Sequence, residues 1–161
     1  MRYTYCRQWF RGKKRPIDLW DEDAARKAHG ERRPYTVLAG EPRSPVGFIE
    51  ITKHYIGVGF LDVELREYLS YQFQEHEPGK LFLTMATHRE FQRNSDFVCR
   101  GTTYFFKTEG VVSIEEEDFL AGTKSTRQTE ADVSCNWEQY PAFNAFSPLL
   151  RVERKIPLSA K

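Results

Sequence analysis

The sequence predicts a mainly β fold (β-rich α+β), an antiparallel up-and-down meander that curls into a barrel or half-barrel, with one or two short helices. Three observations support this prediction. β-Favouring residues alternate with polar residues in about eight short segments. Short connections containing Pro or Gly separate the segments, as in "EPRSP" (41–45) and "HEPGK" (76–80). The strand–helix–strand rhythm of a parallel sheet is absent from the sequence.

The chain has 161 residues, of which 40% are hydrophobic and 14% aromatic, which is enough for a buried core. We predict a single domain, 1–161, in three parts. Residues 1–34 form an N-terminal strand followed by a short helix or loop. Residues 35–134 form the β-meander, and residues 135–161 form an aromatic tail that packs on the sheet.

The N-terminal part opens with the alternating run "RYTYCRQWF" (2–10), which predicts a strand that ends at "RGKKRP" (11–16). The best helix signal follows in "IDLWDEDAARKAHGERRP" (17–34). Its expected N-cap is Asp21 or Asp23, and its expected end is Gly30. The segment is brief and polar, so an ordered loop is the alternative.

The central hairpin, residues 65–91, alternates most clearly. One face is expected to carry Leu65, Leu69, Tyr71 and Phe73, and after the turn the apolar alternation continues with Leu81, Leu83 and Met85. The residues expected on the buried face are Tyr71, Phe73, Leu81 and Leu83.

Two flanking segments carry further signals. In "HYIGVGFLD" (54–62), Gly57 and Gly59 indicate a bend or a close approach of another group. The polar run "KSTRQTEADVS" (124–134) is typical of a strand near a sheet edge. The tail is broken by Pro141 and Pro148, which predicts short helical turns before a final strand. Its aromatic residues, expected to form a lid over one end of the sheet, are Trp137, Tyr140, Phe143 and Phe146.

Motifs for cofactors and metals are missing from the sequence. It has no phosphate-binding loop, dinucleotide fingerprint or nucleophile elbow, so no cofactor is expected. The four histidines lack the spacing of a metal site. We interpret Cys6, Cys99 and Cys135 as small buried apolar residues, with a disulfide pair or a catalytic thiol as alternatives.

His88 and Glu90 are the one pair that suggests catalysis, because alternation places both side chains on one strand face. We interpret them instead as residues of a strand face exposed to water, and predict no catalytic residues and no enzymatic activity. The chain also has no apolar run of the roughly 20 residues that span a bilayer, and no signal peptide. We therefore expect a cytoplasmic protein without a membrane partner.

Charge is unevenly distributed along the chain. Residues 1–34 hold 10 Lys and Arg against 5 Asp and Glu (net +5), whereas residues 35–134 hold 10 against 16 (net −6). The acidic excess is concentrated in two runs: Asp62, Glu64 and Glu67, and then Glu115, Glu116, Glu117 and Asp118. Alternation sends Glu115 and Glu117 to one face and Glu116 and Asp118 to the other.

These seven carboxylates are our candidate partner-binding residues. An acidic surface repels nucleic acid and complements a basic protein. Internal pairing with the basic ends of the chain, or simple solvation at strand ends, is the alternative. The basic cluster Arg11, Lys13, Lys14 and Arg15 lacks the interleaved aromatic residues of single-strand binders, and we interpret it as a loop.

The run "GKLFLTMATHREF…VCRGTTYFFKTEGVVSIEEEDF…ADVSCNWEQYPAFNAFSPLLRVER" resembles the small bacterial immunity proteins of polymorphic-toxin and contact-dependent competition systems. The resemblance covers roughly the C-terminal half. It implies a non-catalytic module that neutralises a cognate toxin by direct binding, the partner being a basic toxin domain such as a nuclease. It transfers no individual functional residue.

The alternative function is that of a lipocalin-like barrel that binds a small ligand. Such a barrel needs an apolar cavity of some hundreds of Å³, whereas an inhibitor needs none. The sequence leaves the oligomeric state open.

Overall fold

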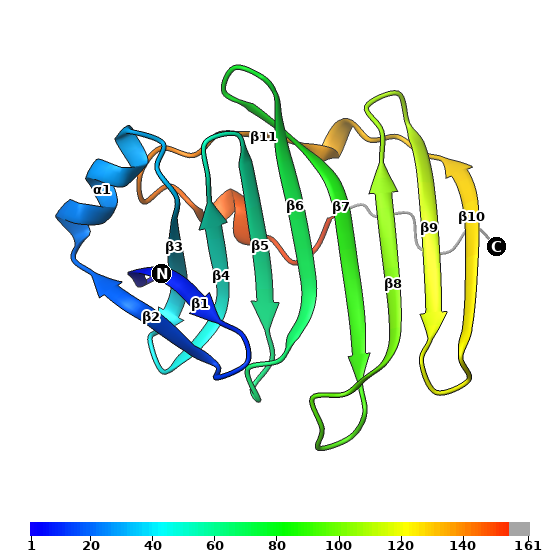
Figure 1. The fold of residues 1–161 in the computed structure, drawn as a ribbon. Helices are drawn as coiled ribbons and strands as arrows, with labels where there is room; N and C mark the ends of the chain where they lie inside the picture. Colours follow the sequence, from blue (N-terminus) through cyan, green and yellow to red (C-terminus); the bar gives the residue numbers. More distant parts are fainter. Residues whose placement is uncertain (155–161) are drawn as a thin grey trace.

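The computed structural model describes residues 1–154, whose strands form one 11-stranded antiparallel sheet (Figure 1). Along the sheet the strand order is β10-β9-β8-β7-β6-β5-β4-β3-β1-β2, and β11 pairs with β7. The strands are β1 (Tyr3–Phe10), β2 (Arg15–Trp20), β3 (Tyr35–Glu41), β4 (Ser44–Ile51), β5 (Tyr55–Leu61), β6 (Glu67–Glu77), β7 (Lys80–Phe91), β8 (Val98–Phe106), β9 (Val111–Asp118), β10 (Thr123–Glu130) and β11 (Trp137–Gln139). The helical elements are α1 (Glu22–Gly30) and two 3-10 turns, η1 (Ser134–Asn136) and η2 (Ser147–Leu150).

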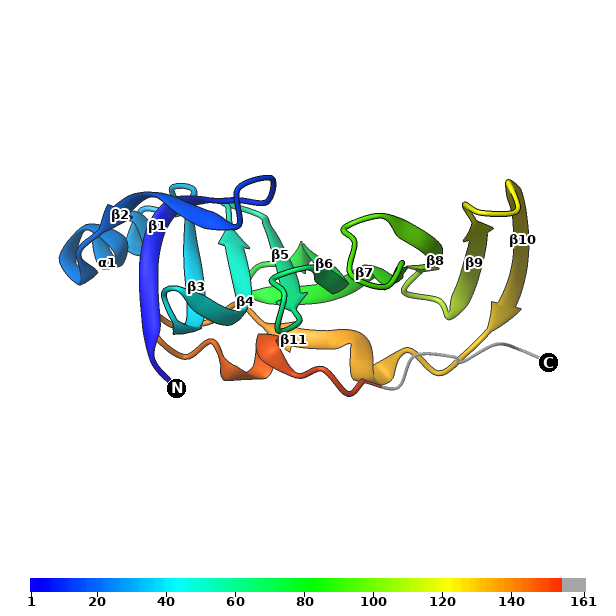
Figure 2. The ribbon, with the colours of Figure 1, turned by 90° about the horizontal axis from the view of Figure 1, so that it is seen from below.

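The sheet is open and curved. Its edge strands, β2 and β10, do not pair with each other. Figure 2 shows both edges bending towards the same side, while the described residues after β10 (residues 131–154) run along the opposite side. We call residues 131–154 the tail from here on. We call the side towards which the edges bend the concave face and the side under the tail the convex face. The predicted mainly β meander is confirmed, in its half-barrel form.

The larger core cluster lies between the convex face, α1 and the tail. From α1 it takes Ala25 and Ala28, and from the tail Phe146 and Leu149. The four residues predicted for the buried face of the hairpin, Tyr71, Phe73, Leu81 and Leu83, are at most 1% exposed. Of the predicted lid aromatics, Tyr140, Phe143 and Phe146 pack against this cluster, whereas Trp137 is 37% exposed and contacts the rings of Phe82 and His76.

A smaller cluster fills one side of the concave face. It consists of Cys6, Trp9, Leu38, Phe48 and Leu61, with Leu65 packed against them. The prediction that Leu65 shares a face with Leu69 is therefore wrong. Leu65 lies in the β5–β6 loop with a positive φ of 59°, and its N–H donates to the carbonyl of Asp62. The strand alternation begins only at Glu67.

β2 is a strand that the sequence pattern did not reveal, since residues 11–34 were expected to hold only a helix or a loop. β2 is an edge strand that pairs with β1 alone, and edge strands are where a proline such as Pro16 is tolerated in a sheet. The helix agrees with its signals. The Asp21 carboxylate accepts a hydrogen bond from the Ala24 N–H, and α1 ends at Gly30.

Two further expectations need correction. A register shift at Gln72/Phe73 moves Met85 to the other face from Leu83, because Met85 pairs with Gln72 and Leu83 with Phe73. The expected final strand does not form within residues 149–154, and its remaining residues lie outside the described part of the chain. Instead, β11 extends the sheet beside the start of β7, and the predicted helical turns are η1 and η2.

Polar contacts fasten the tail to the convex face. The Arg154 guanidinium is almost fully buried, pairs with Glu138 at 2.9 Å and lies over the rings of Tyr71 and Phe73. The imidazole of His29 lies 2.9 Å from the Tyr35 hydroxyl and 2.8 Å from the Pro141 carbonyl. The convex face of the central strands is therefore occupied by the chain itself. Within residues 1–154, no helix has the length and apolar character needed to cross a membrane.

Glu75, at the end of β6, predicts an acid dependence of stability. Its carboxylate accepts hydrogen bonds from His54, from the Gly79 N–H and from Arg32, and these lower its pKa from an ordinary 4.5 to about 2. A carboxylate with a lowered pKa stabilises the fold fully above its unfolded pKa, and this contribution is lost as the pH falls towards 2. We expect the melting temperature to fall between pH 4.5 and pH 2, and to fall less steeply in Glu75→Gln. Equal slopes for the two proteins would contradict this role of Glu75.

Candidate functional site

The strand register assembles a polar surface on the concave face, because directly paired residues share a face of the sheet. One row across the strands has mostly small side chains: Gly59, Ser70, Thr87, Thr103, Glu115 and Thr126. A second row beside it holds Gly57, Gln72, Met85, Phe105, Ser113 and Gln128. A third row, on the other side of the first row, holds Arg89, Gly101, Glu117 and Lys124. We call these three rows the concave surface.

The concave surface is hollowed and carries exposed rings. A depression of about 260 Å³ over β4–β7 is lined by residues that include Arg11, Tyr55, Gly57, Ser70, Met85 and Arg89. Tyr55 is 36% exposed and Phe105 39% exposed. Phe119 is 47% exposed, and its ring lies over Gly101 of the third row. Both polar groups and aromatic rings are thus available on this face.

Arg11 closes one side of the concave surface. Its guanidinium pairs with Glu50 and, at 3.0 Å, with Glu67, and it lies 4.9 Å from the centre of the Phe48 ring. Burial opposes the charge, but the two carboxylates outweigh it and raise the pKa of Arg11. Gly59 makes this packing possible, since a Cβ there would lie 2.3 Å from the Phe48 ring. The close approach predicted at this glycine is confirmed.

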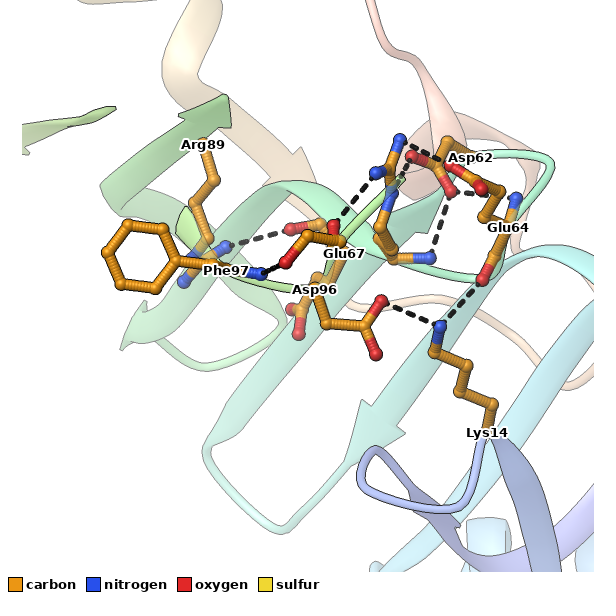
Figure 3. Close-up of polar contacts among 9 residues, drawn as sticks. Lys14, Asp62, Glu64, Glu67, Arg89, Asp96 and Phe97 are labelled. Atoms are coloured by element: carbon orange, nitrogen blue, oxygen red, sulfur yellow. Dashed lines mark hydrogen bonds and ion pairs between the residues drawn. The ribbon is translucent and has the colours of Figure 1, made fainter. Parts of the chain in front are cut away.

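The first acidic run lies at the end of the sheet, where three loops meet (Figure 3). Asp62 accepts hydrogen bonds from the N–H groups of Glu64 and Arg66, and its carboxylate pairs with the Arg66 guanidinium at 2.8 Å. Burial would raise the pKa of Asp62, but the hydrogen bonds outweigh it and lower the pKa. Lys14, from the basic cluster, donates to the Glu64 carbonyl and pairs with Asp96 at 2.8 Å. This run is neutralised mainly by cations of the chain itself.

The second acidic run follows the predicted alternation along β9. Glu115 pairs across the strands with Thr103 on the concave face, whereas Glu116 points to the convex side. Glu115 lies 3.8 Å from Lys124, and Glu116 lies 3.4 Å from Arg127. Within residues 1–154, no cationic side chain lies within 4.0 Å of the Glu117 carboxylate.

Asp118 ends β9 and shapes the turn after it. Its carboxylate accepts hydrogen bonds from the N–H groups of Ala121 and Leu120, and it lies 3.7 Å from Arg100. The hydrogen bond from Ala121 is the main reason that its pKa is lowered. Asp118 caps the turn after β9, and this role accounts for its carboxylate without contact to a partner protein.

The seven predicted carboxylates are therefore not brought together in one patch. Glu67, Glu115 and Glu117 belong to the concave side, Asp62 and Glu64 to the end loop, and Glu116 and Asp118 to the convex side and the turn. Sequence reasoning missed Arg89 and Phe105, whose neighbours on the sheet come from distant segments. The sequence signals for this face were the glycine pair, Gly57 and Gly59, and the alternation that puts Glu115 and Glu117 on one side of β9.

His88 and Glu90 are both exposed on the same side of β7, opposite to Arg89. The structure gives no hydrogen bond between these two side chains, and Glu90 lies 3.9 Å from Arg100. Among the described residues, no three His, Cys, Asp or Glu side chains form a possible metal cluster. His88 also lines a hollow of about 340 Å³ between β6–β8 and the tail.

The cysteines differ from one another. Cys6 is buried, as predicted, and burial raises the pKa of its thiol to about 11. Cys99 is half-buried and Cys135 is exposed, so the prediction of burial is wrong for Cys135. All three are free thiols, so the alternative of a disulfide pair does not hold.

Comparisons with family models, curated proteins and solved structures find no match for this chain. Its function is therefore argued from its own surfaces. Of these, the concave surface combines exposed rings, hydrogen-bonding side chains and carboxylates.

Proposed function

We propose that the protein is a non-catalytic binding module whose concave surface holds a basic partner protein. We further propose, from the resemblance of its C-terminal half, that it acts as an immunity protein that neutralises a cognate bacterial toxin. The proposal rests on one observation: the chain covers one face of the sheet and not the other. The tail and α1 cover the convex face of the central strands, whereas the concave surface is left open to solvent.

The composition of the concave surface supports a protein partner. Exposed aromatic rings such as Phe105 and Phe119 are typical anchors of interfaces, since they bury a large area with few rotatable bonds. Hydroxyl and amide groups in the rows around them can form hydrogen bonds with a partner. A surface with both properties suits a protein better than a nucleic acid, whose phosphates need cations.

The three rows of the concave surface hold two cations, Arg89 and Lys124, and two carboxylates, so the case for a basic partner rests on the carboxylates along β9. Arg11 already neutralises much of the charge of Glu50 and Glu67. Glu115 has only a distant ion pair at 3.8 Å, and Glu117 has none among the described residues. These two carboxylates are therefore the ones of the predicted set that we assign to the interface. Complementary charges of this kind mainly accelerate association.

The small-ligand alternative rests on a closed barrel. The sheet of residues 1–154 is open between β2 and β10, so it encloses no barrel interior. The depression on the concave surface is lined mainly by polar groups, and a more apolar hollow of about 340 Å³ lies between β6–β8 and the tail, lined by residues that include Leu69, Tyr71 and Tyr104. Neither hollow is an enclosed cavity. A small ligand needs a cavity that buries most of its surface. We therefore do not propose this function.

The proposal is tested with the product of the adjacent gene, because an immunity gene lies beside that of its toxin. The toxin domain is produced as a catalytically inactive variant and mixed with this protein. We expect a complex of defined stoichiometry by size-exclusion chromatography, and inhibition of the active toxin by the same protein. If no complex forms and the toxin keeps full activity, the proposed function is wrong.

A further inference from the structure

β10 is an edge strand with an unusually regular backbone. Each of its eight residues pairs with β9, from Thr123 opposite Asp118 to Glu130 opposite Val111, without a register shift. No strand of residues 1–154 pairs with its other side. An edge of this kind presents a row of N–H and C=O groups that can pair with a further strand.

The opposite edge of the sheet is protected in ways that β10 is not. β2 has only six residues, contains Pro16, and bends at Asp18, which has a positive φ of 53°. Proline, shortness and irregular backbone are the usual means of preventing edge-to-edge pairing. β10 contains no proline, no glycine and no residue with a positive φ. Its side chains are polar, so exposure of this regular edge is compatible with solubility.

The side chains of β10 are complementary to those of a second β10 in antiparallel orientation. With Thr126 on a two-fold axis, Lys124 lies opposite Gln128, and Ser125 lies opposite Arg127. No two like charges are then directly opposed. Lys124 is also the diagonal neighbour of Glu130 in the other copy, on the concave side, and diagonal pairs are within reach of long side chains.

We propose that β10 is a self-association surface, through which a second copy of this chain adds its own β10 in antiparallel pairing. Such a contact has the self-complementary form of a two-fold dimer. Because the sheets continue into each other, the two concave surfaces would face the same way. This inference does not depend on the proposed function.

The contact is small. Eight residues on each side fall short of the roughly 1,000 Å² that stable interfaces bury, so we expect a weak dimer that forms as the protein concentration rises. Sedimentation velocity over a concentration series measures this directly. A protein that stays monomeric up to the millimolar range would overturn the proposal.

Charge reversal at the two diagonal positions identifies the surface. In Lys124→Glu alone, and in Glu130→Lys alone, the diagonal charges have the same sign in a homodimer, so each variant should remain monomeric. In an equimolar mixture of the two variants the diagonal pairs are again opposite in sign. We expect dimers to return in the mixture, which also shows that both variants are folded.

Lys107→Glu is the matched control, because it reverses a charge in the exposed β8–β9 loop, which is not part of the free edge of β10. We expect it to dimerise like the wild type. If the wild type dimerises but the single reversals at Lys124 and Glu130 do so equally, another surface forms the dimer and the proposal is wrong. A mixture that is no more dimeric than its separate components would also contradict it.

Discussion

Leu83→Asp is expected to lower the free energy of unfolding by about 4 kcal/mol or more. Leu83 is 1% exposed and pairs with Phe73 across the strands on the convex face. Its carbonyl also accepts a hydrogen bond from the buried Asn136 side chain of η1. A carboxylate at this position would lose its hydration in a core made of apolar side chains, which is costly. Since whole domains are stable by about 5–15 kcal/mol, most of the protein should unfold at moderate temperature.

Met85→Asp is the matched control, with the same substitution two residues along β7. Met85 is half-buried on the concave surface, where a new carboxylate remains in contact with water. We expect the free energy of unfolding of Met85→Asp to fall by about 1 kcal/mol. Urea titration of both variants measures the difference. A melting temperature of Leu83→Asp within about a degree of the wild type would show that the assigned faces of the hairpin are wrong.

Reversing the charges of Glu115 and Glu117 together is expected to slow association with the cognate partner by about 10-fold or more at low salt. The reason is that complementary potential steers the encounter of the two proteins, and the double change to Lys weakens this attraction. Salt screens these charges, so the association rate of the wild type should fall with ionic strength, and that of the variant should fall less.

The same double variant should fold normally, because neither carboxylate is deeply buried. Its melting temperature is the control for an intact sheet. Stopped-flow measurement at several salt concentrations gives the association rates. If rates for both proteins are equal and independent of salt, the acidic residues of β9 are solvated strand residues, as the alternative interpretation holds.

The alternation of side chains was enough to predict the strands of the meander and the faces of their residues, except where a loop or a register shift interrupts it, as at Leu65 and Met85. Tyr71 and Phe73 are buried as expected, since a period of two is a local property of the chain. The helix start at Asp21 was predictable for the same reason, because an N-cap acts within one turn. β2 escaped prediction because its stability comes from pairing with β1 rather than from its own residues.

The site was less predictable, because its contacts join distant parts of the chain. The partners of the first acidic run include Arg11 and Lys14, which are about fifty residues away in sequence and are brought close by the curl of the sheet. No local pattern indicates which charges meet in this way. The separation of Glu115 and Glu117 from Glu116 was predictable, since it follows from alternation alone.

The partner is proposed to bind the concave surface, and neighbouring residues of β9 provide the most direct test. Glu117→Lys and Glu116→Lys change the net charge equally, but their side chains point to opposite faces of the sheet. The measurement is the association rate constant of each variant with the cognate toxin domain at low salt. We predict a rate several-fold below the wild type for Glu117→Lys and a rate close to the wild type for Glu116→Lys. Equal rates for the two variants, or slower association only for Glu116→Lys, would contradict it.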